Sequence, residues 1–252
     1  MAHIRLDHVS VAFPIYDASS RSLKKRVLGA ATGGRIQSES GPSVVQALDD
    51  VTLHFQHGDR VGLVGHNGAG KTTLLRVLAG IYEPGNGTVQ VDGHIAPLFD
   101  IALGMDPEST GYENIVLRGL YLGLSHDEIR ERMSEIAEFT ELGGFLDLPI
   151  RTYSAGMRMR LAFAVSTSIH PDILLLDEGI GAGDAAFLEK ANRRLQEFTN
   201  RAAIIVLASH SEQLVTQMCP TSVLMEHGRV IRVGDTEDIL ARYRRRVARG
   251  LV

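Results

Sequence analysis

One stretch, residues 62–75, restricts the possible folds of this chain more than any other. Its core, Gly65 to Thr72, matches the phosphate-loop pattern G-x-x-x-x-G-K-[ST] at every fixed position. Residues 60–64 before it predict a short buried strand, and apolar residues recur at helical spacing from Leu74 onward. Strand, glycine-rich loop and helix in this order predict a site for the phosphates of a nucleoside triphosphate instead of a chance turn.

The residue types of this loop predict distinct roles. Glycines leave the backbone free to turn tightly and to approach a phosphate, so that backbone N–H groups form an anion cradle at the helix start. Lys71 is expected beside the β- and γ-phosphates of ATP, and the Thr72 hydroxyl is expected to bind Mg²⁺. The predicted nucleotide-contacting residues of the loop are Gly65, Asn67, Gly68, Ala69, Gly70, Lys71, Thr72 and Thr73.

Composition limits the class of protein. The 252 residues and 44% hydrophobic content allow a sizeable core, and we expect one domain across residues 1–252. The net charge of −4 does not indicate a nucleic-acid partner, and the single cysteine, Cys219, suits a reducing compartment. No apolar run approaches the ~20 residues that cross a bilayer, and the N-terminus lacks a signal-peptide core. The chain is expected in the cytosol, or held at a membrane by something else.

The chain begins with an alternating segment and then loses its pattern. Residues 3–13 alternate like a half-exposed strand, and residues 14–46 are rich in Ser, Gly and Pro, which predicts a surface insert. Its basic side chains are either a solvated face or a contact to anionic lipid. These basic residues are Arg21, Lys24, Lys25 and Arg26.

Later segments alternate between helical and strand patterns. Residues 125–142 predict an amphipathic helix with a capping box from Ser125 and Glu128, ended by the glycines at 143 and 144. A second helix is expected at 155–169, buried strands at 173–177 and 203–208, and a strand pair at 223–231. The chain closes with a basic tail that contains Arg242, Arg244, Arg245, Arg246 and Arg249.

Three polar residues follow the two buried strands. In a mostly parallel sheet, ligands bind at the carboxyl edge, where Asp177 can hold Mg²⁺ opposite Thr72. Glu178 can polarise a water aimed at the γ-phosphate, although an acidic pair there could also be a helix start. His210 ends the next strand at the same edge, whereas a lone histidine is more often structural.

At this point the sequence resembles the ATP-binding cassette family over nearly its whole length. Residues 153–157 are similar to the family's signature loop, which Ser154 and Gly156 match, while Met157 departs from it. Residues 173–178 are similar to the Walker B motif with its catalytic glutamate. Asp184 matches the D-loop and His210 the switch histidine.

The resemblance implies a fold and partners. The fold is an α/β nucleotide-binding domain of P-loop NTPases, with a mostly parallel core sheet, an antiparallel β subdomain and a helical subdomain inserted at about 100–168. In that family two cassettes pack head to tail, so that the signature residues Ser154, Gly156 and Met157 would close over the partner's nucleotide. Asp184 is also expected among the nucleotide-binding residues. The cassettes are peripheral, on the cytoplasmic side of the inner membrane, with two copies of an integral-membrane subunit.

Two family positions differ here. The glutamine that usually follows the first lobe is missing from residues 97–107, and Asp100 is the nearest polar substitute as a Mg²⁺ contact. An aromatic ring usually stacks on adenine, a contact worth ~1–3 kcal/mol. Phe13 stands where it is expected, and Tyr16 competes with it because the following insert makes the alignment ambiguous.

Variants of the motifs narrow the function. Residues 103–114, 152–164 and 181–187 resemble ATPases of bacterial exporters of O-antigen, capsule and teichoic acid. The leading hypothesis is therefore the ATPase of a polysaccharide exporter. The alternatives are a nutrient-importer ATPase, which would favour the standard signature loop and glutamine, and a soluble cassette ATPase without a membrane partner.

Two further expectations concern substrate and membrane contacts. The 42 residues after His210 are too few for a β-sandwich, which needs about 100, so no C-terminal carbohydrate-binding domain is expected. The segment from Leu98 to Asn114 is expected to form much of the docking surface for the membrane subunit. The alternative is that its apolar residues, Leu103 and Met105, only pack beneath the helical subdomain.

Overall fold

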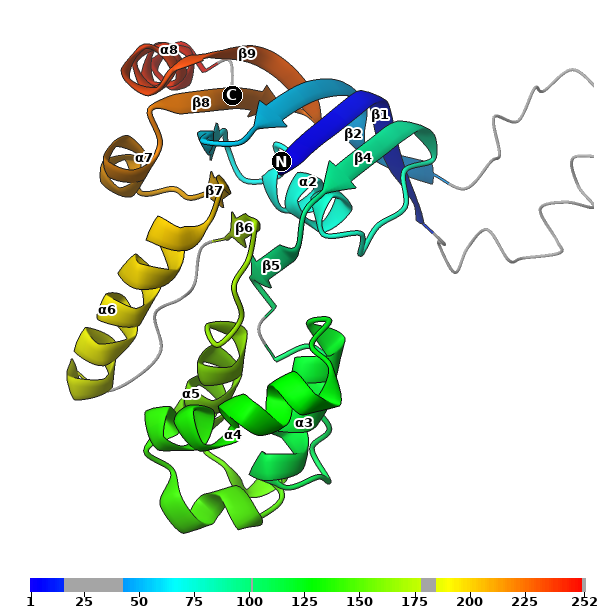
Figure 1. Ribbon diagram of the computed structural model, residues 1–252. Helices are drawn as coiled ribbons and strands as arrows, with labels where there is room; N and C mark the ends of the chain where they lie inside the picture. Colours follow the sequence, from blue (N-terminus) through cyan, green and yellow to red (C-terminus); the bar gives the residue numbers. More distant parts are fainter. Residues whose placement is uncertain (16–42, 101, 178–184, 251–252) are drawn as a thin grey trace, which may run out of the picture.

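The computed structural model describes residues 1–15, 43–100, 102–177 and 185–250, and two sheets organise this part of the chain (Figure 1). The larger has the strand order β5-β6-β7-β3-β8-β9. Its parallel strands are β5 (Ile95–Leu98), β6 (Ile173–Leu176), β7 (Ile204–Ala208), β3 (Arg60–Val64) and β8 (Thr221–Glu226). The antiparallel strand β9 (Arg229–Asp235) forms one edge. The smaller sheet is antiparallel and consists of β2 (Ser43–Gln56), β1 (His3–Ile15) and β4 (Asn86–Asp92). The predicted fold class, with a mostly parallel core sheet and an antiparallel β subdomain, is confirmed.

The helices fall into two groups. One group follows strands of the large sheet and comprises α2 (Lys71–Leu78), α6 (Ala185–Arg201), α7 (Glu212–Met218) and α8 (Thr236–Ala248). The other lies between β5 and β6 in the chain and forms the green lobe of Figure 1. This helical lobe comprises α3 (Gly111–Tyr121), α4 (His126–Thr140), α5 (Ala155–Ser166) and the 3₁₀ turns η2 (Gly143–Asp147) and η3 (Ile150–Thr152). The helical lobe is therefore inserted in the chain between two neighbouring strands of the large sheet.

Alternate residues of the central strands belong to two cores. On β6, Leu174 and Leu176 pack with the helical lobe, while Ile173 and Leu175 pack with α2 and the small sheet. All four are at most 2% exposed, as expected for a strand that is covered on both faces. The apolar runs in the sequence are therefore central strands of the large sheet.

Helix ends differ from the sequence-based boundaries. The capping box of Ser125 and Glu128 forms as predicted, but α4 ends at Thr140, and Glu141 takes the left-handed conformation (φ 57°). The following glycines begin η2 and do not cap α4. Helix α5 stops at Ser166, three residues before the predicted end, because the hydroxyls of Thr167 and Ser168 bond back to helix carbonyls.

Two predictions need correction: the bounds of the insert and the basic tail. Strand β1 extends to Ile15 and β2 begins at Ser43, so residues 14–15 and 43–46 belong to the small sheet and not to an insert. The basic cluster at 21–26 lies outside the described residues. Residues 236–248 form one helix, α8, and its arginines are therefore not a separate tail; Asp235 caps it. In the described part of the chain, no helix is both long and apolar enough to span a bilayer.

Candidate nucleotide-binding site

A hollow of about 520 Å³ opens where the carboxyl ends of the core strands meet the small sheet. Its volume is in the range of small-molecule sites, about 300–1,000 Å³. Segments from five parts of the sequence line it: β1, β2, the phosphate loop with the start of α2, the end of β6 and the end of β7. The lining residues are Phe13, Val45, Gln46, Ala47, Asn67, Gly68, Ala69, Gly70, Lys71, Thr72, Thr73, Asp177, Ala208, Ser209 and His210.

Two glycines give the phosphate loop its shape. Gly68 has φ 83°, and a Cβ atom there would meet nothing within 4 Å, so its backbone faces open space. Gly70 has φ 103° and caps the start of α2; a Cβ atom there would lie 2.7 Å from the carbonyl oxygen of Ala47. The loop therefore needs glycine for backbone conformation at both positions, and for space at the second.

Lys71 lies against the loop that precedes it. Its Nζ donates to the carbonyl oxygens of Gly65, at 2.5 Å, and His66, at 3.1 Å, and the residue is 8% exposed. A lysine this buried is held with its charge directed into the loop, because its carbonyl partners solvate the ammonium. The cation is thus positioned beside the N–H groups at the start of α2, where an anion binds best.

Thr72 and Asp177 meet at the floor of the hollow. The Thr72 Oγ1 donates to Asp177 Oδ2 at 2.8 Å, which joins the start of α2 to the end of β6. A hydroxyl and a carboxylate are oxygen ligands that Mg²⁺ accepts, and this ion usually takes one or two carboxylates together with phosphate oxygens and waters. Among the described residues there is no cluster of three metal-ligating side chains. The donor set therefore fits a Mg²⁺ ion that is shared with bound phosphates.

The tip of the β8–β9 hairpin is hydrogen-bonded to the phosphate loop. His227 and Gly228 both have positive φ, 49° and 78°, as a two-residue type I′ turn requires. The Gly228 N–H donates to the Ala69 carbonyl at 3.0 Å, and the Gly228 carbonyl accepts from Asp49 N–H at 2.9 Å. The turn therefore links the phosphate loop to β2.

Strand β2 supplies one wall of the hollow, and residues 45 and 46 of this wall were predicted to belong to the insert. Phe13 pairs with Val45 across the β1–β2 ladder, and both line the hollow together with Gln46 and Ala47. Phe13 is 38% exposed at the rim, as expected of a ring that stacks on a base. The apolar pair at 44 and 45 was the only sequence signal for this wall. Tyr16 lies outside the described residues.

The structure separates the predicted signature residues from the hollow. Ser154 caps α5, where its Oγ accepts from Met157 N–H at 3.1 Å, and Gly156 follows in the first turn. These three residues lie in the helical lobe and not among the lining residues. Glu178 and Asp184 lie outside the described residues, whereas Ser209, which the sequence-based reading did not select, lines the hollow beside His210.

Asp100 also lies apart from the hollow. Its carboxylate accepts a hydrogen bond from Arg76 Nη2 at 2.7 Å, and its backbone takes the left-handed conformation (φ 48°). This ion pair raises the pKa of Arg76. A contact between Asp100 and Mg²⁺ stays a prediction.

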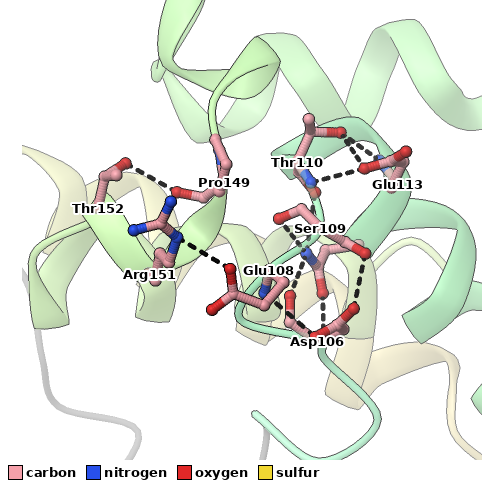
Figure 2. A network of polar contacts seen from close by, with 9 residues as sticks. Asp106, Glu108, Ser109, Thr110, Glu113, Pro149, Arg151 and Thr152 are labelled. Carbon is pink, nitrogen blue, oxygen red and sulfur yellow. Dashed lines mark hydrogen bonds and ion pairs between the residues drawn. The ribbon is translucent and has the colours of Figure 1, made fainter.

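Figure 2 shows how the segment that leads into α3 is tied to the segment that leads into α5. Glu108 forms an ion pair with Arg151 at 3.0 Å, and Ser109 Oγ donates to Asp106 at 2.8 Å. The Ile150 N–H donates to the Ser109 carbonyl at 3.0 Å. Because residue 154 follows closely, this network determines where the start of α5 lies relative to α3.

Comparison with known proteins gives a consistent result. A family model described as ABC transporter matches residues 48–181. The O-antigen export system ATP-binding protein RfbE of Yersinia enterocolitica is 46% identical over 241 residues, which is 95% of this chain and 100% of that protein. The teichoic acids export ATP-binding protein TagH of Bacillus cereus is 37% identical over 79% of this chain and 36% of that protein.

A solved structure shares the fold. A dimeric ATP-binding cassette in a post-hydrolysis state, bound to ADP and Pi, has a TM-score of 0.66 at 21% identity and covers 92% of this chain and 98% of its own. At this identity the likeness supports the arrangement of sheets and helices alone.

Proposed function

This chain belongs to the ABC transporter family, as its motifs indicated, and from that premise we propose that it is the ATPase of a polysaccharide exporter. Members of the family hydrolyse ATP. The observation that carries the proposal is the 46% identity to an O-antigen export protein across that protein's whole length. The transported molecule proposed here is a lipid-linked polysaccharide of the O-antigen type, driven across the inner membrane from its cytoplasmic side.

The hollow supports a division of labour in ATP hydrolysis. Lys71 and the loop N–H groups bind the phosphates, while Thr72 and Asp177 hold Mg²⁺, which supplies neutralisation of phosphate charge when bound. We assign Glu178 to orient or deprotonate the attacking water and His210 to contact the γ-phosphate from the end of β7. Phe13 stacks on the base at the rim.

A second copy of the chain completes the site in this proposal. The residues predicted to close over a nucleotide, Ser154, Gly156 and Met157, are in the helical lobe, away from their own chain's hollow. A head-to-tail pair would bring the start of one α5 to the phosphates of the other chain. The backbone N–H groups at this exposed helix start would then bind the same phosphates from the side opposite the phosphate loop.

The exposed side of α3 is our candidate for contact with the membrane subunit. Leu117, Leu120 and Tyr121 are 38%, 39% and 49% exposed, and Leu103 is 43% exposed. We call these four residues the α3 apolar face; Gly104 packs close to the Tyr121 ring, which places Leu103 near it. Met105, by contrast, is partly buried against the helical core, so the alternative of packing beneath the helical subdomain fits it better. Apolar groups gathered on a surface favour a protein partner.

Export itself tests the proposal. In cells that assemble the polysaccharide, deletion of this gene should keep the polymer inside, and the wild-type chain should restore it at the surface. Glu178→Gln should fail to restore it while still binding ATP, because the attacking water is no longer activated. Surface staining and ATP binding are the measurements. Normal surface polysaccharide in the deletion strain would contradict the assignment.

A further inference from the structure

Four side chains form a continuous row from the rim of the hollow to the start of the helical lobe. The Phe13 ring meets the Tyr82 ring edge to face, with centroids 5.2 Å apart and planes at 69°. Arg76 donates from Nη1 to the Tyr82 hydroxyl at 3.3 Å, and its guanidinium carbon lies 5.7 Å from the centre of that ring. Arg76 in turn donates from Nη2 to Asp100 at 2.7 Å.

The backbone holds Tyr82 in this row. Helix α2 ends in a Schellman motif at Gly80 (φ 70°), where Gly80 N–H donates to the Val77 carbonyl at 3.0 Å and Ile81 N–H to the Arg76 carbonyl at 2.9 Å. The Tyr82 N–H reaches the same Arg76 carbonyl at 3.2 Å. Arg76 therefore contacts Tyr82 through both its main chain and its side chain.

We infer that Tyr82 and Arg76 are positioning residues for the base of the nucleotide, because they hold the Phe13 ring, with Asp100 holding Arg76. The inference rests on the proposed function, in which Phe13 stacks on the base. Phe13 is 38% exposed and would sample several rotamers if nothing packed behind it. The half-buried Tyr82 occupies that space, and the hydrogen bond and cation–π contact from Arg76 fix Tyr82.

The geometry joins the two ends of the nucleotide site through one helix. Lys71 and Thr72 stand at the start of α2, and Arg76 stands on the same helix about 7.5 Å further along its axis. The phosphate cradle and the support for the base-stacking ring are thus parts of one rigid element. A loss of the Tyr82 contact should weaken recognition of the base and leave recognition of the phosphates intact.

The experiment compares two ligands on the full-length chain. Calorimetry measures the Kd of MgATP and of magnesium tripolyphosphate, which carries phosphates without a base. We expect Tyr82→Leu to weaken MgATP about three- to tenfold and to change the Kd of tripolyphosphate by less than twofold, since stacking on a base is worth ~5–150-fold in affinity. Tyr82→Phe keeps the ring contact and should recover most of the loss, and Arg76→Gln should lose an intermediate amount.

Steady-state kinetics and a matched variant complete the test. In Tyr82→Leu, KM for ATP should rise more than kcat falls. Tyr112→Leu, the same change at a 38% exposed position on α3, should bind both ligands like the wild type. Unchanged MgATP affinity in Tyr82→Leu overturns the inference, and so does an equal loss for both ligands, which would make Tyr82 a structural residue only.

Phe13→Ala separates this inference from the function on which it rests. If Phe13→Ala weakens MgATP selectively while the Tyr82 and Arg76 variants do not, only the positioning role is wrong. If Phe13→Ala leaves the affinity for MgATP unchanged, the stacking role of Phe13 in the proposed function is itself wrong.

Discussion

At the scale of single residues, the proposed phosphate site depends most on a buried cation. Lys71 is 8% exposed and bonded to two loop carbonyls, so it supplies charge that no neighbouring side chain of the loop could replace. We expect Lys71→Ala to weaken ATP binding by at least about 100-fold, because a charge-assisted bond to phosphate is lost in a buried setting. Equilibrium binding of ATP measures this.

A lysine elsewhere provides the control for that change. Lys190, on α6, pairs with Glu141 at 2.7 Å, on the side of the helical lobe. Lys190→Ala removes the same charge and should bind ATP like the wild type. Equal losses in both variants would show an effect of net charge instead of a phosphate contact.

Cys219 provides a pH-dependent prediction at the same scale. The thiol is 1% exposed, and burial raises its pKa to about 12 from 9.0. A raised folded-state pKa contributes stability that is present below pH 9 and is lost as pH rises toward 12, because the unfolded chain releases the proton first. Between pH 8.5 and 10.5 the wild type should lose about 2 kcal/mol more unfolding free energy than Cys219→Ala. Urea unfolding at both values measures the difference; equal losses would contradict it.

At the scale of elements, the helical lobe is held by local caps and by one buried ion. Thr110 with Glu113, and Ser125 with Glu128, form capping boxes at the starts of α3 and α4. Hydrogen bonds from Thr110 and Ser125 lower the pKa of both glutamates. These interactions lie close in sequence, and the second box was therefore visible as a pattern. The contribution of these two glutamates to the free energy of unfolding should decrease as pH falls through their lowered pKa values.

Arg118 joins elements that are distant in sequence. It is 1% exposed, donates to the Leu103 carbonyl and to Ser166 Oγ, and burial lowers its pKa to about 10. Among the described residues Arg118 has no ion pair, and its charge is met by these two acceptors and by the Tyr121 ring, whose centroid lies 5.4 Å from the guanidinium carbon. It therefore ties the segment before α3 to the end of α5 at a cost in desolvation.

We expect Arg118→Met to keep the fold and release that segment. Methionine retains apolar volume and removes the desolvation cost, so global stability should change by about 1 kcal/mol or less. Backbone amides of residues 102–106 should exchange hydrogen faster, as measured by mass spectrometry. Arg118→Ala, which also leaves a cavity, should lose about 3 kcal/mol. Unchanged exchange at 102–106 in Arg118→Met would contradict the tie.

At the scale of the whole molecule, the proposed site is divided between two copies of the chain. A Lys71→Ala chain has an intact signature segment, and a Gly156→Asp chain has an intact phosphate loop. Each variant alone should have little ATPase activity, because every head-to-tail site contains one damaged half. Mixed in equal amounts, they should recover up to about a quarter of wild-type activity, because about half of the dimers are mixed and each has one intact site.

The control for this mixture uses damage on the same half. Lys71→Ala mixed with Thr72→Val places both changes in the phosphate loop, so no pairing restores an intact loop, and activity should stay low. Recovery in this control, or none in the first mixture when dimers form, would argue against a shared site.

Membrane docking is also a property of the assembled molecule. Leu117→Cys and Tyr121→Cys on the α3 apolar face should cross-link to the membrane subunit, because these exposed apolar groups would be covered there. Ile231→Cys on β9, 40% exposed and remote from the helical lobe, should not cross-link. Electrophoresis of the purified complex measures this, and equal cross-linking at all three positions would contradict a specific face.

The sequence by itself determined the features that depend on interactions between residues close together in the chain. The phosphate loop, the Ser125 capping box and the apolar runs of β6 and β7 are local patterns, in which hydrogen bonds and burial follow from spacing. Strand order along the chain then predicted that Thr72 and Asp177 would meet, and they do at 2.8 Å. Local patterns were less reliable at helix ends, where the side chains of Thr167 and Ser168 decided the boundary.

Only the tertiary structure decided which distant segments share the site. The register of β1 and β2 brings Val45 beside Phe13, and the hairpin tip at Gly228 meets the phosphate loop. Arg76 contacts Asp100 across 24 positions of the chain, which joins α2 to the segment after β5. Such contacts leave no periodicity in either partner, because each residue alone would be satisfied by water, and their pairing is determined by the fold that surrounds both.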